Sequence, residues 1–211
     1  MLAVEALGLP KMDNQGTLKI LDICAAPGGK SMLAADILNH ADIDYMLEAR
    51  DISEYKVELM QENFNRCHLN KAKAVAWDAL EPDERWLGQA DVVIADIPCS
   101  GLGVIGRKRD IKYKMTPQAV QDIVELQEKI LKVAASYVKK GGKLLFSTCT
   151  VNKDENEAHV KWIQDTLKMT PVSLNGTLPG LVHSPTTQQG FVQLIPGMQD
   201  TDGFFISVFE K

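Results

Sequence analysis

Two cysteines stand where they could do chemistry, because each follows a predicted strand and has polar neighbours. Cys99 lies in the letters DIPCSG, directly after the apolar strand predicted for residues 90–96, and Cys149 lies in STCT, after the strand predicted for residues 143–147. Parallel strands end at the same edge of a sheet, so both thiols should project into one cleft near Asp96. This pair is the strongest candidate for a reactive site in the chain.

The spacing of the cysteines argues against other common uses of thiols. Cys24, Cys67, Cys99 and Cys149 form no CxxC pair, so neither a zinc site nor a redox dithiol is suggested, and we expect no metal. Free thiols in a reducing compartment are the expectation. An isolated cysteine is most often a small buried hydrophobe, and we assign Cys67, at the end of a predicted helix, to that role.

Carboxylates follow the first four predicted strands, at the edge where doubly wound sheets bind their ligands. These acids are Asp22, Asp51, Asp78 and Asp96. An acid after the second strand suits ribose hydroxyls, one after the third can accept from an adenine amino group, and one after the fourth faces the reacting centre. A single aspartate at such a place is commonly a cap or a turn residue. Four at successive strand ends are hard to explain in that way.

A glycine-rich turn opens the first predicted helix of the sheet. The stretch LKILDICAAPGGKS passes from a buried strand into Gly28 and Gly29, which let the backbone approach a ligand before the helix from Lys30. The phosphate pattern G-x-x-x-x-G-K-[ST] would need glycine at Cys24, and the dinucleotide pattern G-x-G-x-x-G fails because the two glycines are adjacent. A nucleoside without a pyrophosphate remains compatible with the loop, and a P-loop-like nucleotide hydrolase is the alternative.

The elements that must position these residues alternate between strands and helices. Strands are predicted for residues 18–23, 45–51, 72–77, 90–96, 143–147, 191–195 and 204–209. Thr116 and Pro117 start the best-defined helix, which Gly141 and Gly142 end. Asn152 and Glu155 have capping-box spacing and start a later helix. The pattern predicts an α/β protein with a doubly wound, seven-stranded sheet, helices on both faces and an antiparallel last strand.

Composition places the chain among ordinary globular proteins. It has 211 residues, of which 45% are hydrophobic and 24% charged, enough for one α/β domain with a substantial core. No run approaches the roughly 18 apolar residues that span a bilayer, and the N-terminus lacks the pattern of a signal peptide. We therefore expect a cytoplasmic protein without a membrane partner.

Charge is unevenly distributed along the sequence. The formal net charge of −5 gives no global case for nucleic-acid binding. Two basic groups stand out, however, and a solvated surface is the alternative interpretation of each. The first comprises Arg107, Lys108, Arg109, Lys112 and Lys114 around Tyr113, and the second comprises Lys139, Lys140 and Lys143. The first follows the Cys99 loop, so we expect it to border the substrate.

Together these motifs resemble the RNA (cytosine-5) methyltransferase family. The S-adenosylmethionine loop of that family reads like DICAAPGGK, and its two cysteine motifs look like DIPCSG and STCT. The similarity continues through GVIGRKRDIKY, the NKDENE helix start and the terminal DGFFIS strand. Within the family the chain is similar to the Sun (Fmu) branch, which methylates small-subunit ribosomal RNA. The resemblance implies a Rossmann-like, S-adenosylmethionine-dependent methyltransferase fold.

The resemblance also implies roles for the residues of the cleft. Cytosine C5 is too weak a nucleophile to take a methyl group directly, but thiolate addition at C6 leaves an enamine whose C5 can attack a sulfonium methyl. On the family pattern Cys149 is the nucleophile, and Asp96 holds or protonates the base at N3. Cys99 then helps to remove the C5 proton, so that Cys149 can be expelled.

Contacts to S-adenosylmethionine follow from the same resemblance. Asp51 is implied at the ribose, Asp78 at the adenine and Asp96 beside the methyl donor. The methionine end is implied to contact Cys24, Ala25, Ala26, Pro27, Gly28, Gly29 and Lys30. The chain departs from the family pattern at Arg50, where an apolar residue is usual, and at Lys108 and Arg109, where His and Pro are usual.

For domain organisation, the resemblance predicts one methyltransferase catalytic domain over residues 1–211. MLAVEAL resembles the middle of the helix that joins the catalytic domain to the family's N-terminal RNA-binding region, so residues 1–16 are a partial linker helix and that region is absent. The expected partner is small-subunit ribosomal RNA, and the expected state is a monomer. Besides the nucleotide hydrolase, the alternative is a non-catalytic cofactor- or RNA-binding module.

Overall fold

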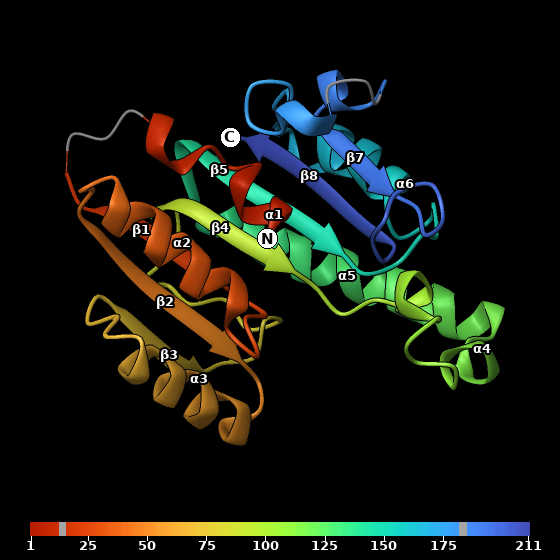
Figure 1. Ribbon diagram of the computed structural model, residues 1–211, viewed down its shortest axis with the longest axis horizontal. Helices are drawn as coiled ribbons and strands as arrows, with labels where there is room; N and C mark the ends of the chain where they lie inside the picture. The colour runs from red at the N-terminus through yellow and green to blue at the C-terminus, as the bar shows by residue number, and fades with distance from the viewer. Residues whose placement is uncertain (13–15, 182–184) are drawn as a thin grey trace.

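One mixed sheet organises the computed structural model, which describes residues 1–12, 16–181 and 185–211 (Figure 1). The described residues form eight strands in the order β3-β2-β1-β4-β5-β8-β6, with β7 paired to β8. Their bounds are β1 Leu18–Asp22, β2 Tyr45–Asp51, β3 Ala72–Ala76, β4 Ala90–Asp96, β5 Val138–Thr148, β6 Thr170–Pro171, β7 Phe191–Leu194 and β8 Phe204–Glu210. The first five strands are parallel, and β8 runs antiparallel to its neighbours. The doubly wound α/β sheet is confirmed, with the two-residue β6 added to the seven predicted strands.

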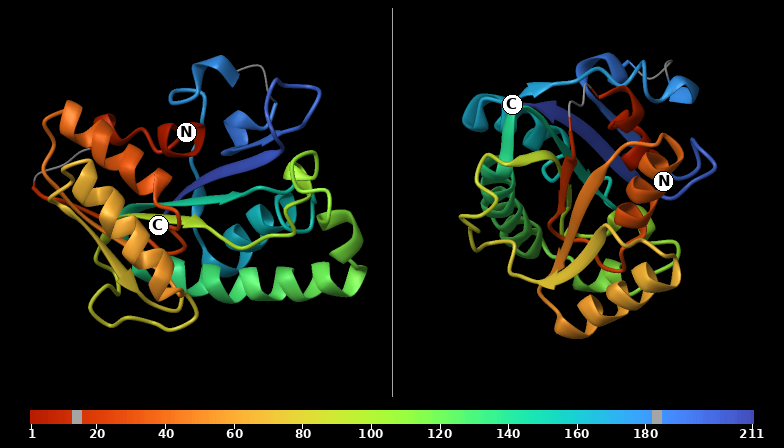
Figure 2. Two further views of the ribbon diagram at one scale, coloured as in Figure 1. Left: turned by 60° about the horizontal axis from the view of Figure 1, so that its bottom comes forward. Right: turned by 90° about the vertical axis from the view of Figure 1, so that its left-hand side faces the viewer.

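Helices cover both faces of the sheet, as predicted (Figure 2). One face carries α1 Leu2–Glu5, α2 Gly29–His40 and α3 Glu54–Arg66, and the other carries α5 Pro117–Tyr137 and α6 Glu157–Trp162. Neighbouring residues of a central strand therefore enter different cores, as Ile20 and Leu21 do. This double cover explains why β4 is buried until it reaches Asp96 and why its residues 92–95 are all apolar.

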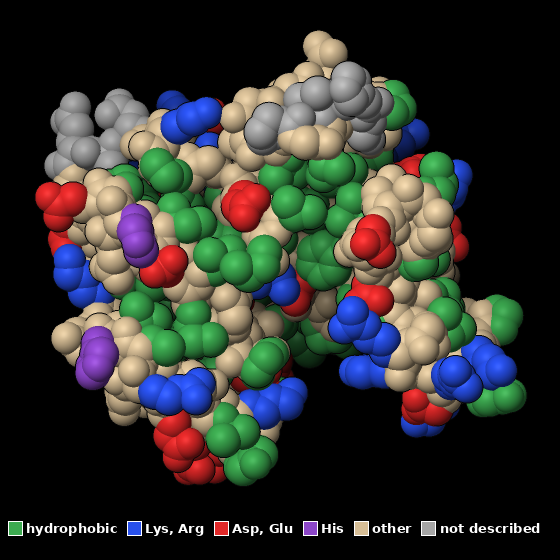
Figure 3. Space-filling model, viewed as in Figure 1, with side chains coloured by type: hydrophobic (Ala, Val, Ile, Leu, Met, Phe, Trp, Pro, Cys, Tyr) green, Lys and Arg blue, Asp and Glu red, His purple; other side chains and the backbone are tan. Residues whose placement is uncertain are grey.

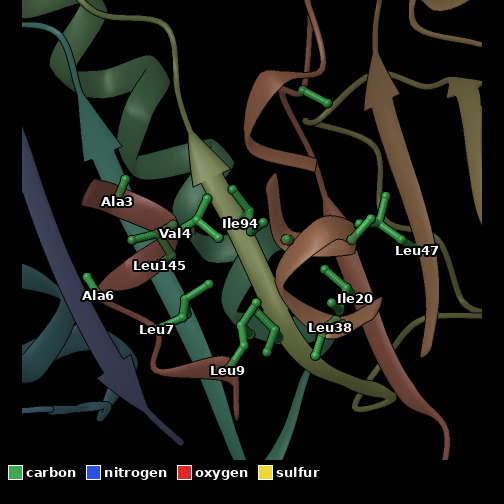
Figure 4. Close-up of a cluster of buried hydrophobic side chains, with 14 of the residues drawn as sticks. Ala3, Val4, Ala6, Leu7, Leu9, Ile20, Leu38, Leu47, Ile94 and Leu145 are labelled. Carbon is green, nitrogen blue, oxygen red and sulfur yellow. The ribbon is translucent and has the colours of Figure 1, made fainter. Parts of the chain in front are cut away.

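The N-terminal segment belongs to the first of these cores. Val4 and Leu7 are fully buried, and with Leu9 they pack against Ile94 and Leu145 of the central strands (Figure 4). The segment holds only the short helix α1 and a 3₁₀ turn at Leu9–Lys11. Of the linker helix predicted for residues 1–16, residues 13–15 lie outside the described residues.

Two predicted helix boundaries are wrong for reasons of packing. Helix α5 begins as predicted, with Thr116 Oγ1 accepting from the Ala119 N–H, but it ends at Tyr137 rather than at the glycines. The chain enters β5 at Val138, and Gly141 (φ 76°) and Gly142 lie within that strand. A Cβ at Gly142 would come 2.9 Å from the Ala90 carbonyl oxygen, so here glycine permits close strand contact instead of ending a helix.

The second boundary concerns α6, which begins at Glu157 with Asn156 as its N-cap residue. The predicted capping box does not form, since Asn152 accepts from the Asp154 N–H and Glu155 is fully buried. A π-helical turn over Ile163–Leu167 continues α6. Short segments complete the described chain: α4 Ile111–Lys114 and the 3₁₀ turns Leu102–Val104, Pro179–Leu181 and Thr187–Gln189. Within the described ranges, no helix has both the length and the apolar character needed to cross a membrane.

Candidate active site

The carboxyl ends of β1 to β5 surround a cavity of about 450 Å³. Seven of the predicted site residues line it, namely Cys24, Ala26, Asp51, Asp78, Asp96, Cys99 and Cys149. Apolar side chains such as Ile52, Leu80 and Ile130 form much of the remaining wall. Because five loops that are distant in sequence meet here, three of the four strand-end acids and both thiols share one site.

The two thiols are in direct contact. Cys99 Sγ and Cys149 Sγ lie 3.2 Å apart, and the Cys149 N–H donates to Cys99 Sγ over 3.3 Å. The hydrogen bond from Cys99 lowers the pKa of Cys149 to about 7, while the same bond and burial raise the pKa of Cys99 well above its usual range. Cys149 is therefore the thiol of the pair that ionises more readily.

Asp96 is held between two neighbouring elements. Its Oδ2 lies 2.6 Å from Lys30 Nζ on α2, and its Oδ1 accepts from Ser147 Oγ at 2.6 Å. Ser147 is the register partner of Asp96 across β4 and β5. An alignment of these two strands in the correct register would have identified Ser147 as a site residue. The carboxylate is thus fixed at the mouth of the cavity, with the Lys30 ammonium beside it.

A second cavity of about 200 Å³ lies under the glycine loop and shares Cys24, Ala26 and Asp96 with the first. Its remaining lining residues are Met1, Asp22, Ala25, Pro27, Gly29 and Lys30.

Gly28 lines neither cavity, although it belongs to the same predicted loop. It caps α2 with a φ of 96°, and a Cβ there would come 3.3 Å from the Met60 side chain. Glycine is therefore required for the turn and for packing against α3.

Asp22 is a site residue to which the sequence assigned no role. Its Oδ2 accepts from Ser31 Oγ at 2.7 Å, while Oδ1 is buried and has no hydrogen-bond partner among the described residues. Burial raises the pKa of Asp22 to about 7. A buried acceptor without a partner is costly, so this oxygen is suited to a hydrogen-bond donor or a cation bound in the smaller cavity. Its position at the end of the first strand was the available signal.

Asp51 and Asp78 each use one oxygen for their own loop. Asp51 Oδ1 accepts from the Ser53 N–H at 3.0 Å, and Asp78 Oδ1 accepts from the Leu80 N–H at 2.9 Å. Within the described part of the chain, Oδ2 of each carboxylate makes no hydrogen bond, and both residues line the larger cavity. Two acceptors are therefore open to a polar ligand.

Arg50, the departure from the family pattern, lies behind the wall of this cavity. Its guanidinium is buried, donates to Glu48 and Asp83, and sits 4.9 Å from the ring centroid of Trp77. Trp77 lines the cavity, and its Nε1 donates to the Glu81 carbonyl oxygen at 2.7 Å. The arginine thus braces a cavity wall without itself lining the cavity.

The prediction for Cys67 is wrong, because its side chain is exposed. Helix α3 ends at Arg66, one residue before the cysteine, so the chain leaves the packed face that carries Met60 and Phe64. Among the described residues, no group of three or more His, Cys, Asp or Glu side chains could hold a metal ion.

The first basic group surrounds the short helix α4, which projects from the body of the protein (Figures 1 and 3). Arg107 pairs with Asp202 at 3.1 Å, and Lys114 pairs with Asp110 at 2.7 Å. The Lys108 ammonium is one of the charges that lower the pKa of Cys149. Lys108 is therefore the member of this group whose charge acts on the thiol side of the cavity, and the position of the group beside a substrate stays a prediction.

The chain is similar to known RNA-modifying enzymes over its whole length. The family model described as "16S rRNA methyltransferase RsmB/F" matches residues 9–210. A "Probable ribosomal RNA small subunit methyltransferase B" of Bacillus subtilis (strain 168) is 38% identical over 214 residues, and a "Ribosomal RNA small subunit methyltransferase F" of Escherichia coli O7:K1 is 29% identical over 213. Each alignment covers 100% of this chain but only 46% and 43%, respectively, of the relative, so the chain spans less than half of either protein.

A solved structure is similar to this chain in fold. The structure of NSun6 from Pyrococcus horikoshii with SFG superposes with a TM-score of 0.78 at 25% identity, covering 100% of this chain and 52% of that one. The similarity of fold therefore extends over all of this chain and about half of the solved chain.

Proposed function

Because the chain belongs to the 16S rRNA methyltransferase RsmB/F family, we propose that it transfers a methyl group from S-adenosylmethionine to C5 of a cytosine in small-subunit ribosomal RNA. The transfer proceeds through a covalent bond between Cys149 and C6 of the base. The observation that carries this proposal is the thiol pair, in which Cys99 donates to a Cys149 whose pKa is lowered to about 7. We further propose that residues 1–211 act as one catalytic domain, since the described helices pack on a single sheet.

The two cavities fit S-adenosylmethionine by the chemistry of their walls. The unpartnered Oδ1 of Asp22 suits an ammonium group, and the N-terminus of α2 suits a carboxylate, as the two ends of an amino acid require. Asp51 and Asp78 offer acceptors for ribose hydroxyls and an adenine amino group, beside the apolar walls of the larger cavity. When bound, S-adenosylmethionine supplies an electrophilic methyl group.

The chain's own residues then account for the remaining chemistry. The Cys149 thiolate adds to C6, the C5–C6 π electrons shift toward C5, and Asp96 holds the base through a proton that it shares with N3. Once the Cys149 sulfur is bonded to carbon it is no longer an anion, so the largest cause of the raised pKa of Cys99 is removed. Cys99 can then lose its own proton to solvent, and its thiolate takes the proton from C5. The electron pair of the C–H bond restores the C5–C6 double bond and expels the Cys149 thiolate.

The site does not favour the alternative of a nucleotide hydrolase. The lysine that would meet a phosphate, Lys30, already pairs with Asp96 at 2.6 Å, and Cys24 occupies the position of the first glycine. We also propose that the basic group around α4 holds the RNA beside the thiols, because Lys108 lies near Cys149. A monomeric state and a cytoplasmic location stay predictions of the sequence.

The test uses small-subunit ribosomal RNA carrying 5-fluorocytosine. Fluorine replaces the hydrogen at C5 of this base, so the final loss of the C5 proton cannot occur. With S-adenosylmethionine, the native chain should form a protein–RNA complex that survives denaturant, and ordinary RNA should gain 5-methylcytosine. Cys149→Ala should form neither product while binding S-adenosylmethionine with native affinity. Cys67→Ala is the matched control, because this exposed cysteine lies outside the cavity. A complex that persists in Cys149→Ala would assign the nucleophile to another residue.

A further inference from the structure

A buried dipeptide, Glu155-Asn156, connects the two loops that carry the thiols. Both residues are fully buried and lie directly before α6. Glu155 Oε2 accepts from the Ser100 N–H at 2.8 Å, and Oε1 accepts from Ser100 Oγ at 2.5 Å and from Thr150 Oγ1 at 3.3 Å. One carboxylate therefore holds the residue after Cys99 and the residue after Cys149.

Asn156 holds the Cys149 loop from both sides. Its Oδ1 accepts from Thr148 Oγ1 at 2.6 Å, and its Nδ2 donates to the Thr150 carbonyl oxygen at 3.0 Å. Thr148 and Thr150 are the two neighbours of Cys149 in the chain. The asparagine thus fixes the backbone that presents this sulfur to the cavity.

The Cys99 loop is held in a matching way with the help of α5. Gln127 Nε2 donates to the Pro98 carbonyl oxygen at 2.8 Å and to Glu155 Oε2 at 3.2 Å, so both neighbours of Cys99 are fixed. His159 Nε2 lies 2.9 Å from Gln127 Oε1. Because burial lowers the pKa of His159 to about 4, its ring is neutral at pH 7, and it brings no positive charge to Glu155.

We propose that Glu155 and Asn156 position the Cys99 and Cys149 thiols, and that their buried hydrogen bonds hold the two sulfur atoms in contact. The effect of this positioning on catalysis rests on the proposed function, whereas the hydrogen bonds that hold the loops do not depend on it. Among the described residues, no cation pairs with Glu155, and four donors reach its carboxylate: the Ser100 N–H and the side chains of Ser100, Thr150 and Gln127. A buried carboxylate without a cation depends on such donors. Each donor tethers one of the cysteine loops or α5, so the donors that satisfy this charge also lock the site.

The direct consequence concerns the reactivity of Cys149. Its pKa is lowered first by the hydrogen bond from Cys99, and that bond needs the 3.2 Å separation of the sulfur atoms. A small shift of either loop would lengthen it and leave Cys149 protonated at neutral pH. Other charged groups that act on Cys149 are Asp96 and Lys108, and neither contacts Glu155. Thiol ionisation therefore reports on the positioning role.

The test compares Glu155→Gln with Glu157→Gln, which makes the same change at an exposed site on α6. In Glu155→Gln an amide N–H faces at least one of the existing donors, so the loops should separate. We expect kcat for RNA methylation to fall roughly 10- to 100-fold, with the KM for S-adenosylmethionine within about twofold of the native value. The midpoint of the pH dependence of Cys149 alkylation by iodoacetamide, followed by mass spectrometry, should rise by about one pH unit. Glu157→Gln should match the native chain in every measurement.

Two outcomes would overturn the inference. One is an alkylation midpoint in Glu155→Gln equal to that of the native chain. The other is that same unchanged midpoint together with a loss of S-adenosylmethionine affinity and thermal stability, which would give Glu155 a purely structural role. If Glu155→Gln does not fold, Ser100→Ala removes only the side-chain half of the contact and should raise the same midpoint by a smaller amount. If alkylation shifts as expected but the native chain methylates no RNA, the proposed function fails and the positioning role stands.

Discussion

Single residues acquire different chemistry at this site because their surroundings differ. Cys99 and Cys149 are the same residue type at hydrogen-bond distance, and their pKa values are moved in opposite directions. Asp22 and Asp96 likewise both end central strands. Asp22 is buried, and one of its oxygens has no partner in the described part of the chain, whereas Asp96 contacts Lys30 and Ser147. Roles at this scale follow from which donors reach each group.

The ionisation of Cys149 gives a prediction about pH. Because its pKa is lowered to about 7, the thiolate fraction should rise as pH rises through 7 and level off above it. The rate of Cys149 alkylation should follow that curve. Cys99→Ala removes the hydrogen bond that lowers the pKa of Cys149 and should move the midpoint up toward the usual cysteine value of about 8.5. Cys99→Ser keeps a hydrogen-bond donor, so its midpoint should lie between those of the native chain and Cys99→Ala. An unchanged midpoint in Cys99→Ala would show that the contact does not control the thiolate.

The proposed role of Cys99 as a base gives a second prediction. At a pH above the shifted midpoint, Cys99→Ala should still attack ordinary RNA, but the C5 proton has no acceptor and Cys149 is not expelled. A denaturant-stable protein–RNA complex should therefore accumulate, as gel electrophoresis can show, while the native chain turns over. The double variant Cys99→Ala/Cys149→Ala is the control and should form no complex. Normal turnover in Cys99→Ala would leave Cys99 with a structural role.

At the scale of elements, the site depends on loops that pack backbone against backbone. Gly103 lies in the 3₁₀ turn after the Cys99 loop, and its N–H donates to the Cys149 carbonyl oxygen at 3.0 Å. Its own carbonyl oxygen accepts from the Gly203 N–H at 2.9 Å. Three loops that are distant in sequence thus meet at one residue without room for a side chain.

Gly103→Ala tests that close approach. A Cβ would come 2.3 Å from the Gly203 carbonyl oxygen and 2.8 Å from that of Cys149, so the backbone must move. We expect a loss of stability of about 1–3 kcal/mol, which is a fall in Tm of roughly 2–4 °C for each kcal/mol. Methylation should fall with it. Gly106→Ala is the control, because nothing lies within 4 Å of that position, and calorimetry should give native stability there. Equal Tm values for both variants would refute the packing argument.

For the whole molecule, the distribution of charge matters more than its sum. The net charge is −5, but Lys108 of the basic group around α4 acts on Cys149 in the cavity. Lys139 and Lys140 lie at the start of β5, whereas the cysteines lie at the carboxyl ends of the strands. The two basic groups can therefore be separated by experiment.

Arg107→Ala/Arg109→Ala should weaken RNA binding and flatten its dependence on salt. Each lost contact to a single-stranded phosphate should lower the slope of log K against log salt by about 0.7. Affinity for S-adenosylmethionine should stay unchanged, since neither arginine lines the cavities. Lys139→Gln/Lys140→Gln removes the same charge at the opposite edge and should keep the native slope. Fluorescence anisotropy across a salt series measures both, and identical slopes in all three proteins would make the α4 group a solvated surface.

The sequence by itself determined the central strands and the place of the site, because these depend on local patterns. Apolar runs that end in Asp22 or Asp96 predict buried parallel strands, and parallel strands bring their carboxyl ends together. The glycine loop and the two cysteine motifs were likewise readable as short strings. For this reason every predicted site residue except Gly28 lines one of the two cavities.

Only the tertiary structure decided which polar groups are buried and what they contact. Glu155 has the three-residue spacing of a helix cap, yet its partners Ser100 and Gln127 lie 55 and 28 residues away in sequence. Gly141 and Cys67 also differ from prediction, because neighbouring strands and the end of α3 determine their surroundings. Local spacing competes with contacts that form when distant segments pack together. A buried carboxylate takes the donors that packing brings to it, since an unsatisfied charge in the interior costs more than a missing cap.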